Sequence, residues 1–226
     1  MKKMNLSQTE KLAYLFLILV FGLGIYYSNT NLQYFDDVYT KEDGFAEYGT
    51  AFLLLSSSIL LISRFFKLFN SKKILWKIGM FLIAIVFIFG AGEEISWGQR
   101  IFNVESSAYF LENNAQGETN LHNMVVDGKK VNKIIFSQLL TLILVVYLII
   151  TPILYRKFDS IKKLANLFAV PIVQWHHTFA FLISTGFVTF MPSDRKWELY
   201  ELAFAVIFFL IFLNPFNKSI YVPYEK

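Results

Sequence analysis

Two adjacent carboxylates are the side chains in this sequence best suited to proton transfer. Glu93 and Glu94 stand directly after the uncharged run Ile78–Gly92. A charge at the centre of a membrane helix costs about 2.5–3.5 kcal/mol, so carboxylates at such a place are functional candidates. We therefore expect Glu93 and Glu94 to be catalytic, with at most one facing the bundle interior squarely, because neighbouring helical residues point in different directions. The alternative is that both lie among lipid headgroups, where Arg100 neutralises one of them.

Two polar side chains follow this pair closely. Gln99 and Arg100 end the tract that begins at Gly90, and we expect them to bind a polar or anionic headgroup. The guanidinium fork of arginine matches the geometry of phosphate and carboxylate groups. The alternative for Arg100 is a simple anchor at the membrane interface.

A second polar tract, Gln116–Asn123, contains a carboxylate and an imidazole four positions apart. If this tract is helical, Glu118 and His122 share one face and offer either two ligands or an acid–base pair. We expect Glu118 to be catalytic and His122 to bind a metal. The alternative is an ordinary solvated loop with a helix cap at Thr119 or Asn120.

The adjacent imidazoles His176 and His177 follow Pro171 inside a long uncharged stretch. Ionisable residues within membrane segments are rare and face the bundle interior or a water-filled cavity. Both histidines are therefore candidate metal ligands close to mid-membrane. The alternative is a pair held by hydrogen bonds to the backbone or to Gln174. These two histidines do not suit a haem, because adjacent residues cannot bind one iron from opposite faces.

Glu198 and Glu201 share a face at the start of the last apolar stretch, and we expect Glu201 to be a metal ligand. The positive end of the helix dipole offers a purely structural reason for both carboxylates. The chain has 3 His and no Cys, so a metal would be held by nitrogen and oxygen. Catalytic zinc uses three such ligands plus water, and a further carboxylate can act as base.

The elements that would position these side chains are membrane helices. The chain has 226 residues, of which 55% are hydrophobic and 18% aromatic, and its mean hydropathy is +0.47. A spanning helix needs roughly 20 mostly apolar residues. Uncharged stretches occur at Leu12–Phe35, Tyr48–Ser63, Ile78–Gly92, Ile134–Tyr155, Leu164–Ser193 and Leu202–Asn217. The shorter ones reach a full span with flanking residues, so the third span is expected from about Ile74 to Glu94. Together these stretches predict an all-α fold: one integral membrane domain, residues 1–226, of about six transmembrane helices, with a structured outer segment, about Trp97–Lys133, between helices 3 and 4.

The distribution of charge predicts the orientation of this bundle. With the N-terminus in the cytoplasm, most Lys and Arg residues fall in cytoplasmic segments and most acids on the outer face. The positive-inside rule then favours two cytoplasmic termini. The net charge of +4 reflects membrane orientation rather than binding of nucleic acid. We expect a multi-pass protein of a cell membrane, the inner membrane of a bacterium.

Two boxes carry a resemblance to a known group of proteins. Gly90–Arg100, which reads GAGEEISWGQR, and Gln116–Asn123, which reads QGETNLHN, resemble boxes of uncharacterised bacterial multi-span membrane proteins. The layout is also loosely similar to membrane hydrolases of the alkaline ceramidase type, in which helices hold zinc through histidines near one membrane face. The His-x-x-x-His pair of that family is absent, since His176 and His177 are adjacent, so the similarity implies a type of site only.

These observations lead to one functional hypothesis and two rivals. We expect a metal-dependent hydrolase or transferase with a divalent metal such as zinc, acting at the outer face on a lipid or lipid-linked substrate from the bilayer, in a chain that can form a homo-oligomer. The rivals are a proton-coupled transporter or channel and a non-catalytic sensor or assembly protein. The hypothesis requires that the acids and imidazoles of separate stretches meet in one pocket.

Overall fold

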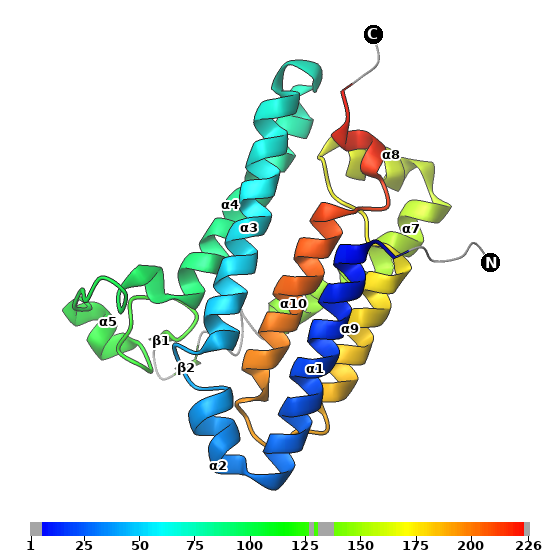
Figure 1. Ribbon diagram of the computed structural model, residues 1–226. Helices are drawn as coiled ribbons and strands as arrows, with labels where there is room; N and C mark the ends of the chain where they lie inside the picture. Colours follow the sequence, from blue (N-terminus) through cyan, green and yellow to red (C-terminus); the bar gives the residue numbers. More distant parts are fainter. Residues whose placement is uncertain (1–5, 127–128, 131–137, 224–226) are drawn as a thin grey trace.

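The regular secondary structure of the described residues is helical apart from one short pair of strands. The computed structural model describes residues 6–126, 129–130 and 138–223 (Figure 1). The two strands pair antiparallel, with Val125 opposite Lys130. The elements in chain order are α1 (Gln8–Thr30), α2 (Leu32–Tyr34), the π-helical turn η1 (Phe35–Tyr39), α3 (Phe45–Leu68), the 3₁₀ turn η2 (Phe69–Ser71), α4 (Ile74–Glu94), the 3₁₀ turn η3 (Ser96–Gly98), α5 (Ala108–Asn113), β1 (Val125–Val126), β2 (Lys129–Lys130), α6 (Leu140–Val145), the π-helical turn η5 (Val146–Ile150), α7 (Thr151–Lys157), α8 (Asp159–Leu167), α9 (Trp175–Val188), α10 (Lys196–Leu213) and the 3₁₀ turn η6 (Lys218–Tyr221).

Four helical segments of the described chain are long and apolar enough to cross a membrane. They are Gln8–Thr30, Phe45–Ser71, Ile74–Glu94 and Leu140–Lys157, and at most 28% of the most apolar stretch of each is buried inside the protein. Most of their apolar side chains therefore point outward. A surface of this kind is unfavourable in water and favourable against lipid, as in a protein embedded in a bilayer.

The two remaining predicted spans differ from expectation. The run Leu164–Ser193 is not one helix, because extended backbone separates α8 from α9. Pro171 lies in this break, and proline cannot donate the hydrogen bond that a continuous helix needs. α9 has 14 residues, about 21 Å, which is shorter than the roughly 30 Å hydrocarbon core. α10 has 18 residues but carries Lys196, Glu198 and Glu201 near its start.

α10 lies at the centre of the bundle, with α1, α3 and α9 packed against it (Figure 1). Its buried side chains include Leu199, Leu202, Ile207 and Ile211. Gly24 of α1 allows close approach, since a Cβ there would lie 2.6 Å from the Leu199 side chain. The helix most buried in the core is thus also the one that carries Glu198 and Glu201.

The two ends of the bundle are named here by the course of α1, which begins at the proximal end and finishes at the distal end. α10 runs the opposite way, so it finishes at the proximal end (Figure 1). There, Asn214 donates a 3.0 Å hydrogen bond to Glu10, and Arg64 donates one of 3.1 Å to the carbonyl of Leu213. α3 begins and α4 finishes at the distal end. Glu94 and Glu201 therefore lie distally, and Glu10 lies proximally.

Candidate functional sites: an acidic cavity and a buried Glu–His–His group

A cavity of about 600 Å³ lies between α4, α10 and the α6–η5 segment. Its walls are mostly apolar and include Leu54, Phe87, Leu144, Phe204, Phe208 and Phe212. At the distal end the lining changes to carboxylates and an imidazole, namely Glu93, Glu94, His122 and Glu201. From Glu201 to Phe212 the cavity follows α10 over roughly 16 Å of helix. Its shape and polarity suit an amphiphile, with the polar part at the distal end.

Glu94 and Glu201 are the carboxylates most open to a ligand in this cavity. Glu94 is the last residue of α4 and is half-buried, and Glu201 is exposed on the second turn of α10. They are near enough for their charges to interact. Within the described residues neither side chain takes part in a hydrogen bond or an ion pair, so both oxygens of each remain available to a molecule in the cavity.

Glu93 has a different role, although it also borders the cavity. It is buried, and one oxygen accepts hydrogen bonds from the backbone N–H groups of Leu121 (2.7 Å) and His122 (3.0 Å). The other oxygen accepts from Nε1 of Trp97 at 2.9 Å. Nδ1 of His122 lies 3.8 Å from the same carboxylate. Glu93 therefore fastens the loop that carries His122 onto the end of α4.

The two sequence boxes pack against each other beyond α4. The tract around Glu118 is not helical, so Glu118 and His122 do not share a helix face. Glu118 is buried, accepts hydrogen bonds from Ser96 (2.6 Å) and Asn120 (2.9 Å), and forms an ion pair with Arg100. Gln99 accepts a 2.7 Å hydrogen bond from the backbone of Thr119, which lies in the same tract. Glu118 and Gln99 are therefore engaged in contacts within the protein.

Arg100 lies outside the spanning segments and bridges two acids, Asp43 and Glu118. Burial alone would lower the pKa of its guanidinium, but the hydrogen bond to Asp43 and the charges of Glu47 and Glu42 raise this pKa above its ordinary value. The cation is thus fixed within the protein. Arg100 could bind a headgroup only if the headgroup displaced Asp43 or Glu118 from the guanidinium.

A tight turn after α4 makes this arrangement possible. Ser96 and Trp97 have φ of 46° and 55°, in the left-handed region that non-glycine residues seldom adopt. The turn brings the indole of Trp97 back over Glu93 and places the hydroxyl of Ser96 on Glu118.

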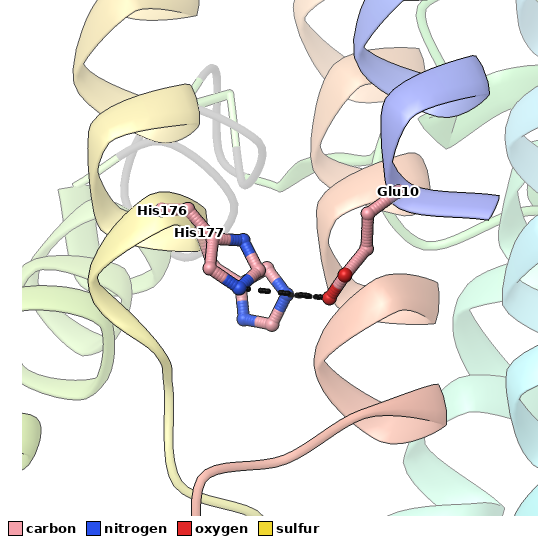
Figure 2. Close-up of side chains that lie close together, drawn as sticks. All are labelled: Glu10, His176 and His177. Carbon is pink, nitrogen blue, oxygen red and sulfur yellow. Dashed lines mark ion pairs between the residues drawn. The ribbon is translucent and has the colours of Figure 1, made fainter. Parts of the chain in front are cut away.

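A second cluster, the Glu10–His176–His177 group, lies at the proximal end (Figure 2). Glu10 comes from the first turn of α1, and both histidines come from the first turn of α9. All three are buried, and their ligand atoms lie within 4.8 Å of one another. Oε1 of Glu10 is 3.5 Å from Nε2 of His176 and 3.7 Å from Nε2 of His177. A group of this composition and spacing can hold a metal ion.

Neighbouring side chains orient the group. Tyr14 shares a 2.8 Å hydrogen bond with Nδ1 of His176. Glu10 accepts from the backbone of Ser7 at 2.7 Å and from Asn214 at 3.0 Å. In contrast, Nε2 of His177 is buried and makes no hydrogen bond within the part of the chain that is described.

The residues predicted to form one pocket therefore divide between two places. Glu93, Glu94, His122 and Glu201 border the distal cavity. His176 and His177 lie with Glu10, which accepts a hydrogen bond from Asn214 at the end of α10. Asn214 comes thirteen residues after Glu201, so the two places are roughly 20 Å apart along α10. Glu118, Gln99 and Arg100 lie in the distal network beside the cavity.

Sequence reasoning missed Glu10, which belongs to the proximal group, and Tyr14, which is hydrogen-bonded to His176. The signal near Glu10 is Ser7-x-x-Glu10, which predicts a capping box at a helix start, and the structure has that box. The same carboxylate also faces the two histidines, because α1 and α9 begin side by side (Figure 2). The capping box already accounts for Glu10 in the local sequence, so its contact with the two histidines can be seen only from the packing of the helices.

Comparison of the chain with protein-family models, curated proteins and solved structures finds no match.

Proposed function

We propose that this chain is an integral membrane enzyme, a hydrolase or transferase, that acts on a lipid or lipid-linked substrate held in the distal cavity. One observation carries the proposal: Glu94 and Glu201, from two different helices, project without partners among the described residues into a cavity whose other walls are mostly apolar. An acyl chain would lie along α10, and the scissile bond would lie beside the two carboxyl groups.

Two carboxyl groups can supply both halves of an acid–base reaction. In the hydrolysis of an ester, the ionised carboxylate takes a proton from water as the water oxygen attacks the carbonyl carbon. The protonated carboxyl then gives its proton to the leaving alkoxide. With an alcohol in place of water the same pair catalyses group transfer. Glu93 and Glu118 act in this proposal as positioning residues, because their oxygens already accept hydrogen bonds from the loop.

The proposal includes an arrangement in the membrane. In this arrangement the four long apolar helical segments, α9 and α10 all cross the bilayer, and the extended segment before α9 completes its crossing. The distal end faces outward and both termini face the cytoplasm, as the distribution of basic residues favours. The Glu10–His176–His177 group takes no direct part in the reaction, because it lies far from Glu94 and Glu201.

Lipid turnover in liposomes tests the proposal. The chain would be reconstituted with a total bacterial lipid extract, and products would be followed by mass spectrometry. We expect wild-type protein to consume a lipid class, and Glu94→Gln or Glu201→Gln to slow this by about 10²–10⁴-fold, the usual contribution of an acid or base. Glu112→Gln is the matched control, since Glu112 is an exposed residue of α5, and it should leave turnover unchanged.

Turnover that is unaffected by either cavity substitution would refute the assignment of Glu94 and Glu201. Lipid that binds in the cavity without being consumed in any of the preparations would refute catalysis and favour the non-catalytic sensor.

A further inference from the structure

We infer that the Glu10–His176–His177 group is a binding site for a divalent transition metal of the zinc class, which joins the start of α1 to the start of α9. The site is separate from the proposed lipid cavity and goes beyond the proposed function. It includes Glu10, in the first turn of the first helix.

The distances within the group fit a tetrahedral ion. Zinc lies about 2.0–2.1 Å from nitrogen and oxygen ligands, which places neighbouring ligand atoms of a tetrahedron roughly 3.4 Å apart. Oε1 of Glu10 lies 3.5 Å and 3.7 Å from Nε2 of His176 and His177. Both histidines direct their rings toward the carboxylate (Figure 2). The ligand atoms of all three residues lie within 4.8 Å of one another, so modest side-chain movements would complete the three protein ligands.

The charge in the group also points to a cation. Glu10 is 0% exposed, and a buried ionised carboxylate is costly without a positive partner. Its ion-pair partners among the described residues are the two histidines, and no lysine or arginine there forms an ion pair with it. A divalent ion would neutralise the carboxylate while both imidazoles stay neutral, as ligation requires.

The surroundings of His176 resemble the second layer of known metal sites. Its Nδ1 lies 2.8 Å from the hydroxyl of Tyr14. If the ring donates to that hydroxyl, the lone pair of Nε2 faces Glu10, the arrangement in which a metal-bound histidine is held by a neighbour. Without a cation, that lone pair would face the negative oxygen of Glu10.

His177 supplies the independent observation. Its Nε2 is fully buried, makes no hydrogen bond among the described residues, and lies on the side of Glu10. On its other side, Nδ1 accepts a 3.4 Å contact from the backbone N–H of Gln174, which is long for a hydrogen bond. Metal ligation moves the ring proton to Nδ1 and gives up this weak contact, in exchange for a partner at the buried Nε2.

The ligand types define the metal class. Two imidazoles and one carboxylate suit zinc and its transition-metal neighbours, whereas magnesium and calcium prefer oxygen ligands. Because the three ligands are buried and come from the first turns of two helices, the ion would act as a cross-link at the proximal end. Binding to the folded state alone raises stability, so the metal-loaded chain should unfold at a higher temperature.

Metal analysis of the full-length chain in detergent tests this inference. Protein from zinc-supplemented cells, washed with a weak chelator, should contain about one zinc per chain. Glu10→Gln and His177→Ala should each lose at least nine tenths of it. His122→Ala is the matched control because it changes the third histidine, at the distal end, and it should keep the full equivalent. Stripping wild-type protein with a strong chelator should lower its melting temperature by several degrees.

X-ray absorption at the zinc edge of the wild-type chain is a second measurement that does not depend on how any variant folds. It should show nitrogen and oxygen ligands at about 2.0 Å, two of them imidazoles. Wild-type protein without stoichiometric metal would overturn the inference, as would a shell lacking two imidazoles. Loss of metal from His122→Ala with retention in His177→Ala would do the same. Glu94→Gln and Glu201→Gln should keep their zinc, so failure of the proposed enzyme leaves this test intact.

Discussion

The backbone N–H of Leu121 donates a 2.7 Å hydrogen bond to Oε2 of Glu93. This contact separates the roles of two neighbouring acids in the sequence. Glu93 turns toward the loop and holds it, whereas Glu94 turns into the cavity with no partner among the described residues. The two carboxylates at the end of α4 are thus a positioning residue and a candidate catalytic residue.

We predict that Glu93→Ala destabilises the protein by roughly 2–4 kcal/mol. The change removes an acceptor for three hydrogen bonds, and those to a charged group contribute about 1.5–3 kcal/mol each, less what water recovers. Thermal unfolding in detergent measures the loss, and limited proteolysis should show faster cleavage near Leu121. Glu112→Ala is the control and should change the melting temperature little. An unchanged melting temperature for Glu93→Ala would show that the loop is held by other contacts.

Gly79 provides a test of the packing of α4. A Cβ at this position would lie 1.9 Å from the backbone carbonyl oxygen of Phe168, and backbone cannot move aside cheaply. Gly79→Ala should therefore cost about 1–3 kcal/mol, as overpacking usually does. In Gly22→Ala the added Cβ meets nothing within 4 Å, so this control should be neutral or slightly stabilising. Equal melting temperatures for the two variants would contradict the contact between α4 and the end of α8.

Arg100 is predicted to stabilise the distal network. Arg100→Ala leaves the buried Glu118 without its cation and should cost about 1–3 kcal/mol, less than for a fully buried pair because Arg100 is about one third exposed. Arg100→Lys should recover only part of the loss, since lysine lacks the fork. Urea unfolding measures both.

Arg195→Ala is the matched control for Arg100. Arg195 pairs with Glu42 and Glu198 at 3.6 Å and is similarly exposed, so its loss should cost under about 1 kcal/mol. If Arg195→Ala is as damaging as Arg100→Ala, the burial of Glu118 is not what makes Arg100 important.

Much of the bundle can be predicted from the sequence, because each membrane helix is formed by one continuous run of apolar residues. The prediction of a span from about Ile74 to Glu94 agrees with the bounds of α4. The structure of the fifth uncharged run, Leu164–Ser193, was harder to predict, because the absence of charged residues does not reveal a break in the helix. Pro171 and the positive φ of Ala169 interrupt it, and His176 and His177 consequently lie in the first turn of α9, beside Glu10.

The candidate sites were predictable where helix polarity alone brings residues together. Glu94 ends one helix and Glu201 begins another, so alternating helices place both at the distal end. The partnership of Glu10 with His177 depends on which helices lie side by side, and neither the apolar runs nor the capping pattern specifies that. The tract around Glu118 could not be placed either, because its structure depends on contacts with Ser96 and Arg100.

Bound lipid is the most direct test of the central claim, that the cavity holds an amphiphile with its polar end at Glu94 and Glu201. Gly90 lines the cavity, and a Cβ there would meet only Leu54, at 3.4 Å, so Gly90→Phe should fill the distal part. Gly22→Phe adds the same ring on α1, where a Cβ meets nothing within 4 Å. Native mass spectrometry should find about one lipid on wild-type protein and on Gly22→Phe, and little on Gly90→Phe. Equal lipid on all three proteins, or none on wild type, would contradict the account.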